Sequence, residues 1–181
     1  AIEGSGTIDG HGFGTWEEFW RRYAEAQKRS GNADTFRNKD LMRPRVLYVS
    51  NSKNVDISGV TFKNAKFWTT HFYQCEDVVV HDCVILADVT KDSKGRVLKG
   101  PSTDAVDIDK CRNFTVRGCR ISVNDDGVVV KGGKGAWAND YAKHPENGPS
   151  SNVIVEDCDF LAPTHSCLTL GSECPEAYGI I

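Results

Sequence analysis

Three short polar segments carry the residue types that could do chemistry: Ser102-Thr103-Asp104, Asn124-Asp125-Asp126 and Thr164-His165-Ser166. Each lies next to an apolar run typical of a short β-strand, so the polar groups mark the points where strands begin. Hydrolysis of a glycosidic bond needs a carboxylic acid that protonates the leaving oxygen and other carboxylates that activate water from the opposite face. The segments therefore predict an acid–base site, provided that the fold stacks them.

A repeated pattern supplies the elements that would position these groups. It consists of Asn or Asp, alternating apolar residues, and a small or acidic residue before Val or Cys. Four clear copies and one degenerate copy occupy residues 54–62, 77–85, 113–121, 152–160 and 2–10. The clear copies start 23, 36 and 39 residues apart, which indicates a period in the low twenties with insertions. Such self-similarity with almost no helical periodicity predicts an all-β fold, a right-handed single-stranded parallel β-helix.

The repeat also explains how distant acids could meet. Equivalent positions on successive turns of a parallel β-helix stack about 4.8 Å apart, the spacing of hydrogen-bonded strands. Asp104 and Asp125 are 21 residues apart, which is close to one turn. We therefore expect these carboxylates to be neighbours in space.

The cysteines fall into the same registers. The predicted inward columns are Val60, Cys83, Cys119 and Cys158, with Cys75 and Cys111 forming a shorter one. The count of seven is odd, and a buried thiol packs as a small hydrophobe, so we expect free, stacked thiols. A disulfide to a loop residue such as Cys174 stays open. No Cys-x-x-Cys pair supports a zinc site, and acid–base hydrolysis requires neither a metal nor a cofactor.

Composition limits the class of protein. A chain of 181 residues with 39% hydrophobic residues can form one domain with a real core. Its net charge of −3 and pI near 6.0 give no electrostatic footprint for nucleic acid. No apolar run is long enough to span a membrane. The chain opens inside a repeat copy and stops soon after a predicted strand, so we expect residues 1–181 to be the central part of a longer β-helix.

Two insertions interrupt the repeat. Residues 15–26 have aromatic residues at helical spacing, with Thr15 and Glu18 as a capping box, which predicts a helix near 15–28 that lies against the coil. Residues 132–151 are rich in Gly, Asn, Pro and Lys and indicate a long loop. Within this loop, Trp137 either binds substrate by stacking on a sugar ring or packs locally.

The chain resembles the family 28 glycoside hydrolases, the polygalacturonase family. The similarity extends from Gly6-Thr7-Ile8-Asp9-Gly10 through Arg43-Pro44-Arg45 to Leu170-Gly171-Ser172-Glu173. Phe67-Trp68-Thr69-Thr70-His71 is similar to the bacterial, often exo-acting, branch.

The family's motifs are Asn-Thr-Asp, Asp-Asp, Gly-His-Gly and Arg-x-Lys. Thr103-Asp104, Asp125-Asp126 and His165 match the first three in order, and the fourth would lie beyond Ile181. Three residues replace the family's Asn and its two Gly: Ser102, Thr164 and Ser166.

This resemblance implies an inverting hydrolase of α-1,4-galacturonosyl or related pectic linkages. Asp125 matches the general acid, Asp104 and Asp126 match the pair that holds and activates water, and His165 would tune the acid or position substrate. Carboxylates packed together raise at least one pKa, because like charges disfavour ionisation. The implied partner is a pectic polysaccharide or oligosaccharide, with no nucleic acid or membrane partner, and the implied location is secreted or periplasmic.

Other polar residues have weaker interpretations. Lys131 either meets a uronate carboxylate as a point charge or is a solvated lysine. His71 is expected to pack or to contact substrate at the rim rather than to act as a catalyst. Asp107 and Asp109 are expected to cap a turn or a strand.

Two alternatives keep the coil and change the function. One is β-elimination as in pectate lyases, in which carboxylates hold calcium and an arginine acts as base; no arginine lies near the three motifs. The other is a non-catalytic, carbohydrate-binding β-helix such as an adhesin or a phage-spike rod.

Overall fold

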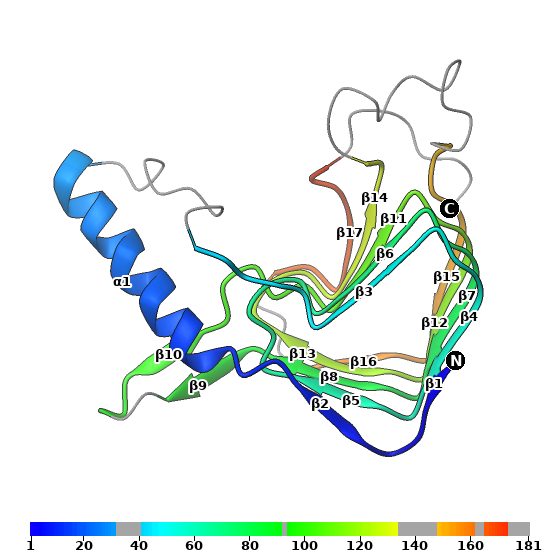
Figure 1. Cartoon of the computed structure of the whole chain (residues 1–181), viewed down its shortest axis with the longest axis horizontal. Coiled ribbons are helices and arrows are strands. Elements are labelled where there is room, and N and C mark those ends of the chain that lie inside the picture. The colour runs from blue at the N-terminus through cyan, green and yellow to red at the C-terminus, as the bar shows by residue number, and fades with distance from the viewer. Residues whose placement is uncertain (32–40, 92–93, 134–147, 162–164, 174–181) are drawn as a thin grey trace.

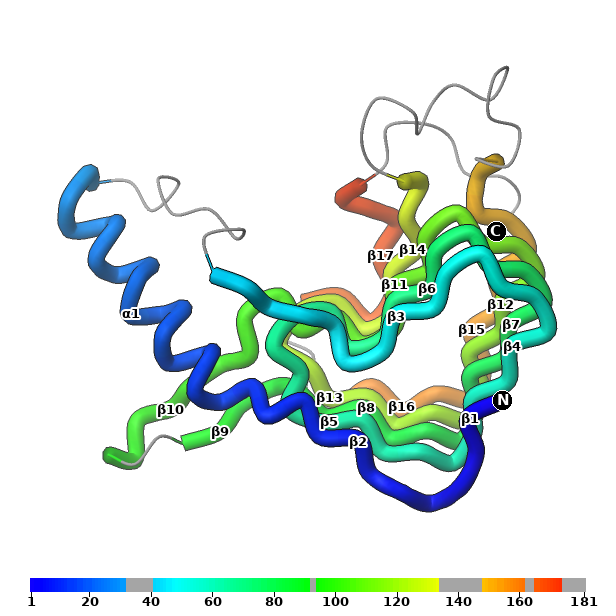
Figure 2. Tube along the Cα trace, viewed as in Figure 1, coloured from blue at the N-terminus to red at the C-terminus, as the bar shows by residue number. Residues whose placement is uncertain are grey.

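The strands wind into a right-handed parallel β-helix, which confirms the predicted fold class (Figure 1). This computed structural model describes residues 1–31, 41–91, 94–133, 148–161 and 165–173. Within them, three five-stranded parallel sheets form the walls of the coil. Figure 2 shows the same path as stacked rungs, each made by strands from all three walls.

Each wall takes one strand from every rung. The first contains β1 (Ile2–Glu3), β4 (Lys53–Ser58), β7 (Glu76–His81), β12 (Arg112–Arg117) and β15 (Ser151–Glu156). The second contains β2 (Thr7–Asp9), β5 (Thr61–Lys63), β8 (Val84–Ala87), β13 (Arg120–Val123) and β16 (Asp159–Phe160). The third contains β3 (Leu47–Ser50), β6 (Thr70–Tyr73), β11 (Val106–Asp109), β14 (Val128–Lys131) and β17 (Leu168–Leu170).

The repeat copies correspond to the corner between the first two walls. Each clear copy supplies one strand of the first wall, a tight turn, and one strand of the second wall. The turns need left-handed backbone, which Gly, Asn and Asp tolerate best. Gly59, Asp82, Gly118 and Asp157 have φ values of 73°, 53°, 60° and 52° at this corner.

The Asn or Asp that opens each copy is also left-handed and forms a ladder. Asn54, Asp77, Asn113 and Asn152 have φ values between 52° and 55°. The side-chain amide of Asn113 donates to Asp77 Oδ1 at 2.8 Å, and that of Asn152 donates to Asn113 Oδ1 at 2.8 Å. Hydrogen bonds between rungs therefore hold the residues that bend the chain.

The interior is a continuous apolar column. Phe72 and Phe114 are fully buried, and their rings meet edge to face with centroids 5.0 Å apart. Cys75, Cys83, Cys111 and Cys119 are buried free thiols, and Cys158 is a partly buried one, as expected. Cys174 lies outside the described residues, so a loop disulfide stays a prediction.

One helix, α1 (Phe13–Ser30), is described between β2 and β3 and lies outside the coil (Figure 1). Trp16 anchors it by donating its indole N–H to the Ala65 carbonyl at 2.8 Å. Trp20 donates in the same way to Lys99 at 2.8 Å, on the hairpin of β9 (Val89–Lys91) and β10 (Val97–Lys99).

The predicted capping box is wrong. Gly12 is the N-cap and no side chain caps this end, so Thr15 lies inside the helix. Glu18 instead accepts hydrogen bonds from Arg21 and Arg22, one turn further along the helix. Glu18 therefore pairs along the helix surface and does not form the cap that the sequence suggested. None of the described helices is long and apolar enough to cross a membrane.

Candidate active site

The strand register of the third wall brings the three sequence motifs together. Val106 of β11 pairs with Val128 of β14, which pairs with Leu168 of β17. Two residues before these partners are Asp104, Asp126 and Ser166, and three residues before them are Thr103, Asp125 and His165. Residues on adjacent rungs are about 4.8 Å apart, so the motifs form one patch at the start of three neighbouring strands.

A cavity of about 590 Å³ lies over this patch. Asp104, Asp125 and Asp126 line it together with Lys131 and Glu173. The other lining residues are one arginine, two aromatic residues, a serine and the end of β17 with the residues after it: Arg45, Phe67, Trp68, Ser102 and residues 169–172. The lining therefore combines carboxyl groups with basic and aromatic side chains.

Main-chain hydrogen bonds hold Asp104 in place two residues before β11. Its carbonyl accepts from the Thr69 N–H at 2.7 Å, and the residue is buried, with only 5% exposed. Thr103 Oγ1 donates to the Ala87 carbonyl at 2.6 Å and accepts from the Asn124 N–H at 3.3 Å. This threonine thus ties the Asp104 loop to the segment that carries the next acid.

Ser102 begins that loop in left-handed backbone, with a φ of 53°. Asn adopts this region more readily than Ser, because its short amide forms local hydrogen bonds. Ser102 thus replaces the family's Asn at a position in the cavity wall where the left-handed backbone favours Asn.

Asp125 and Asp126 are half-buried and held by backbone amides. The Asp126 N–H donates to Asp125 Oδ1 at 3.0 Å, and the Ser166 N–H donates to Asp126 Oδ1 at 3.0 Å. Gly127 lets the next rung approach, since a Cβ there would lie 2.5 Å from the Cys167 carbonyl oxygen. His165 is exposed, and its positive charge, when present, would lower the pKa of Asp125.

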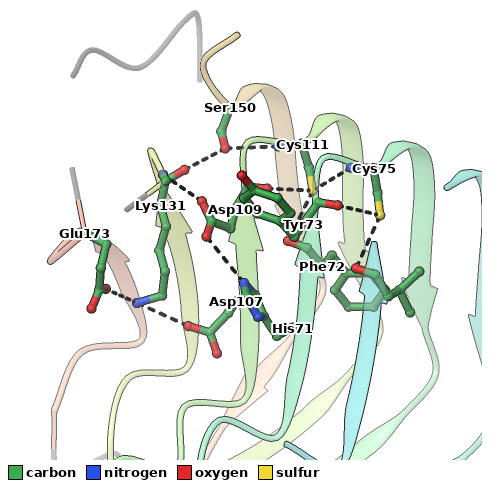
Figure 3. A network of polar contacts seen from close by, with 12 residues as sticks. His71, Phe72, Tyr73, Cys75, Asp107, Asp109, Cys111, Lys131, Ser150 and Glu173 are labelled. Atoms are coloured by element: carbon green, nitrogen blue, oxygen red, sulfur yellow. Dashed lines mark hydrogen bonds and ion pairs between the residues drawn. The ribbon is translucent and has the colours of Figure 1, made fainter. Parts of the chain in front are cut away.

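Lys131 is the centre of a buried ionic network (Figure 3). Its ammonium lies 2.9 Å from Glu173 Oε2, 3.3 Å from Asp107 Oδ1 and 3.8 Å from Asp104 Oδ2. It also lies 4.2 Å from the centroid of the Trp68 ring. With 2% exposed, Lys131 is not the solvated lysine of the sequence alternative. Its charge is already surrounded by carboxylates.

The expectation that Asp107 caps a turn or a strand is wrong. It does not cap a strand but lies inside β11, fully buried, with no hydrogen-bond partner of regular geometry for either oxygen among the described residues. Val106 and Ile108 point into the core, so alternation directs Asp107 toward the cavity side. Asp109 does end the strand, and accepts from the Gly133 N–H at 2.7 Å.

His71 is packed rather than exposed. Its Nε2 lies 3.4 Å from Asp109 Oδ2 (Figure 3). Its ring centroid lies 5.1 Å from those of Tyr48 and Trp68. Burial lowers the pKa of His71, which favours the neutral ring. It is not among the described residues that line the cavity, and it supports Trp68, which is.

Burial sets the protonation of the acids. It raises the pKa of Asp104 to about 7, with the charge of Asp125 adding to the shift and that of Lys131 opposing it. It also raises the pKa of Asp125 and holds that of Asp107 well above its usual range. At least one carboxyl group of this cluster therefore holds a proton near neutral pH.

Arg45, Phe67, Trp68 and Glu173 are cavity residues to which the sequence reasoning gave no role. Trp68 precedes β6 by two residues, as Asp104 precedes β11, since Thr70 pairs with Val106. The register of the third wall could therefore have placed Trp68 beside the acids. Arg45 shares this register position, two residues before β3, since Leu47 pairs with Thr70. An arginine therefore does lie beside the acids, contrary to the sequence expectation. Glu173 follows β17 and carries no such signal.

A second cavity, of about 240 Å³, lies at the corner between the third and first walls. There Glu76 pairs with Lys53 at 2.6 Å and with Arg112 at 3.4 Å. This corner balances opposite charges instead of gathering carboxylates, so the acid–base candidate is the larger cavity.

Two predicted positions, Trp137 and Thr164, lie outside the described residues. Within the described ranges, no group of three His, Cys, Asp or Glu residues is arranged to hold a metal ion.

A parallel β-helix with carboxylates gathered at one sheet edge is the architecture of carbohydrate-active enzymes that the sequence motifs indicated. Residues 1–165 match the family described as Glycosyl hydrolases family 28. The chain therefore belongs to glycosyl hydrolases family 28.

Relatives and solved structures agree with this assignment. The chain is 26% identical to a "Probable polygalacturonase" of Vitis vinifera, over 93% of this chain and 28% of the relative. It is 25% identical to an "Exopolygalacturonase" of Zea mays, over 87% of this chain and 36% of the relative. It thus spans about a third of the length of these relatives.

Two exopolygalacturonase structures share the fold. The family 28 enzyme of Yersinia enterocolitica has a TM-score of 0.68 at 16% identity, over 94% of this chain and 31% of that one. The enzyme of Thermotoga maritima has a TM-score of 0.58 at 24% identity, over 87% of this chain and 33% of that one.

Proposed function

We propose that the protein containing this chain hydrolyses α-1,4-galacturonosyl or related pectic linkages with inversion. The observation that carries the proposal is that Asp104, Asp125 and Asp126 line one cavity at the start of adjacent rungs. Family membership and the polygalacturonase names of its relatives point to the same substrate class. A pectic substrate lies outside the cytoplasm, so we also propose a secreted or periplasmic location.

The roles follow from the needs of inversion. An inverting site uses an acid and a base with room for water between the base and the sugar. We assign the general acid to Asp125, whose raised pKa favours the protonated form. Asp104 and Asp126 hold and activate the water, and His165 acts on the charge of Asp125 from the next rung.

The test is the Asp125→Asn variant in the full-length protein. Asn keeps the shape but has no proton to transfer, so turnover of polygalacturonate should fall by roughly 10² or more, the scale of general acid catalysis. Trigalacturonate binding should persist. An Asp157→Asn variant, which changes an exposed turn residue, is the control. Reducing-end release is the measurement.

Two other results would overturn the proposal. An unsaturated product that absorbs in the ultraviolet, formed only with calcium, would identify a lyase. Bound oligogalacturonate without any cleavage by the wild-type protein would identify a binding module. Undiminished activity of Asp125→Asn would overturn the assignment of the acid.

A further inference from the structure

Arg45 presents a fixed cation to the acidic cavity. It is half-buried, lines the cavity, and its guanidinium carbon lies 4.8 Å from the centroid of the Trp68 ring. The Tyr48 and Phe67 rings lie 5.5 Å and 5.6 Å from the same atom. Contacts between a guanidinium and aromatic faces are attractive, so three rings hold this group in place.

The other cation of the cavity is already engaged. Lys131 lies within 4.0 Å of three carboxylates, as described above. Arg45, in contrast, forms no ion pair with any described residue, and its buried Nε has no hydrogen-bond partner. A guanidinium that is held in place, partly desolvated and unpaired favours an external anion, and its planar fork suits a carboxylate.

An anionic substrate needs a cation in this cavity, because the lining is rich in carboxyl groups. Asp104, Asp125, Asp126 and Glu173 line it, and these carboxylates repel an anionic sugar. A substrate that carries a carboxylate can enter only where a cation compensates for its charge. Among the described lining residues, the cation that is not paired within the protein is Arg45.

We propose that Arg45 binds the C6 carboxylate of a galacturonate residue and selects the free acid over its methyl ester. This inference rests on the proposed function, since it names a specificity determinant of the same cavity. Tyr48, Phe67 and Trp68 position the guanidinium, and the Trp68 ring also contacts the Lys131 ammonium at 4.2 Å.

Arg43 is a matched control from the same segment. It also stacks on aromatic rings, 4.6 Å from the Phe19 centroid and 4.8 Å from that of Phe67. Its guanidinium, however, donates to the main-chain carbonyls of Pro101 and Lys66, and it does not line the cavity. Replacing it should affect stability rather than substrate selection.

The experiment compares Arg45→Gln, Arg45→Lys and Arg43→Gln in the full-length protein. The substrates are trigalacturonate and its methyl ester, and the readout is the ratio of their kcat/KM values. Arg45→Gln should lower kcat/KM for the acid by roughly 10- to 100-fold, the scale of a charge-assisted hydrogen bond, and change the ester little. Arg45→Lys should recover part of the ratio, because it keeps the charge without the planar fork.

A second arm measures binding of both trisaccharides to the Asp125→Asn variant with and without Arg45→Gln. Loss of affinity for the acid alone supports the inference. An unchanged acid-to-ester ratio in active Arg45→Gln protein, or an equal change in Arg43→Gln, overturns it while leaving the hydrolase proposal intact. Absence of both binding and cleavage by the wild-type protein overturns both.

Discussion

At the scale of single residues, the environment of each carboxyl group distinguishes otherwise identical side chains. Asp104 is almost fully buried beside Lys131, whereas Asp125 and Asp126 are half-buried. Burial disfavours a charged carboxylate, and the ammonium of Lys131 partly offsets that cost for Asp104. Lys131 thus acts on the acids from within the protein, through its charge.

The environment of Asp104 predicts how the activity depends on pH. If Asp104 must be ionised to activate water, kcat/KM should fall as the pH drops below about 7, the pKa of Asp104. Lys131 lowers that pKa, so Lys131→Met should raise it and move the acidic limb upward by roughly one unit or more. The pH dependence of polygalacturonate hydrolysis checks this.

Lys63→Met is the matched control, because it removes one positive charge from a different wall, where Lys63 pairs with Asp9 at 3.4 Å. Its profile should follow that of the wild type. Identical acidic limbs in all three proteins would show that Lys131 does not set the protonation of the site.

At the scale of elements, left-handed residues in register make the corners of the coil. Asn113 combines both requirements, because its φ is 53° and its side chain hydrogen-bonds to the rungs on both sides. The same strand then buries Phe114 and Val116 in the core. A defect at Asn113 therefore disturbs a corner without touching the core.

Two substitutions of Asn113 separate the contribution of the left-handed backbone from that of the side-chain hydrogen bonds. Asn113→Ala should destabilise the protein by about 2 kcal/mol, since it loses two exposed hydrogen bonds and strains the left-handed backbone. Asn113→Gly should cost about 1 kcal/mol, because glycine tolerates the conformation and loses only the hydrogen bonds. Chemical denaturation measures both. Equal losses would refute the backbone contribution.

At the scale of the whole molecule, the buried acids couple stability to pH. The pKa values of Asp104 and Asp107 are both above their ordinary value of 3.8 in the folded chain. Their stabilising contribution is therefore complete below about pH 4 and is lost as the pH rises through the folded pKa values. His71 has the opposite sign, because its lowered pKa makes protonation at acidic pH destabilising.

One substitution isolates Asp107 from these other groups. The Asp107→Asn variant cannot ionise, so its melting temperature relative to the wild type should increase between roughly pH 5 and pH 8. Thermal unfolding across that range is the measurement. Asp157→Asn, on the surface, should run parallel to the wild type. A constant difference for Asp107→Asn would show that Asp107 is already ionised in the folded protein across this range, so that its pKa is not raised.

The sequence by itself determined the coil and its three motifs. Alternating apolar residues and left-handed Asn, Asp and Gly recur at a nearly constant period, and such local preferences directly define strands and corners. The period also placed Asp104 near Asp125, because one turn of the coil separates them. The free thiols followed from the same register.

Only the tertiary structure decided which polar side chains are buried together. Alternation alone did not reveal that Asp107 would be fully buried 3.3 Å from the Lys131 ammonium, since burial on the outer face depends on loops from other rungs. Glu173 reaches the cavity from beyond the end of β17, where no strand register predicts a neighbour. The helix begins at Phe13 rather than at Thr15, and Glu18 pairs with Arg21 and Arg22 instead of capping the helix. Charge and burial at the site are properties of contacts between rungs, which a single strand does not encode.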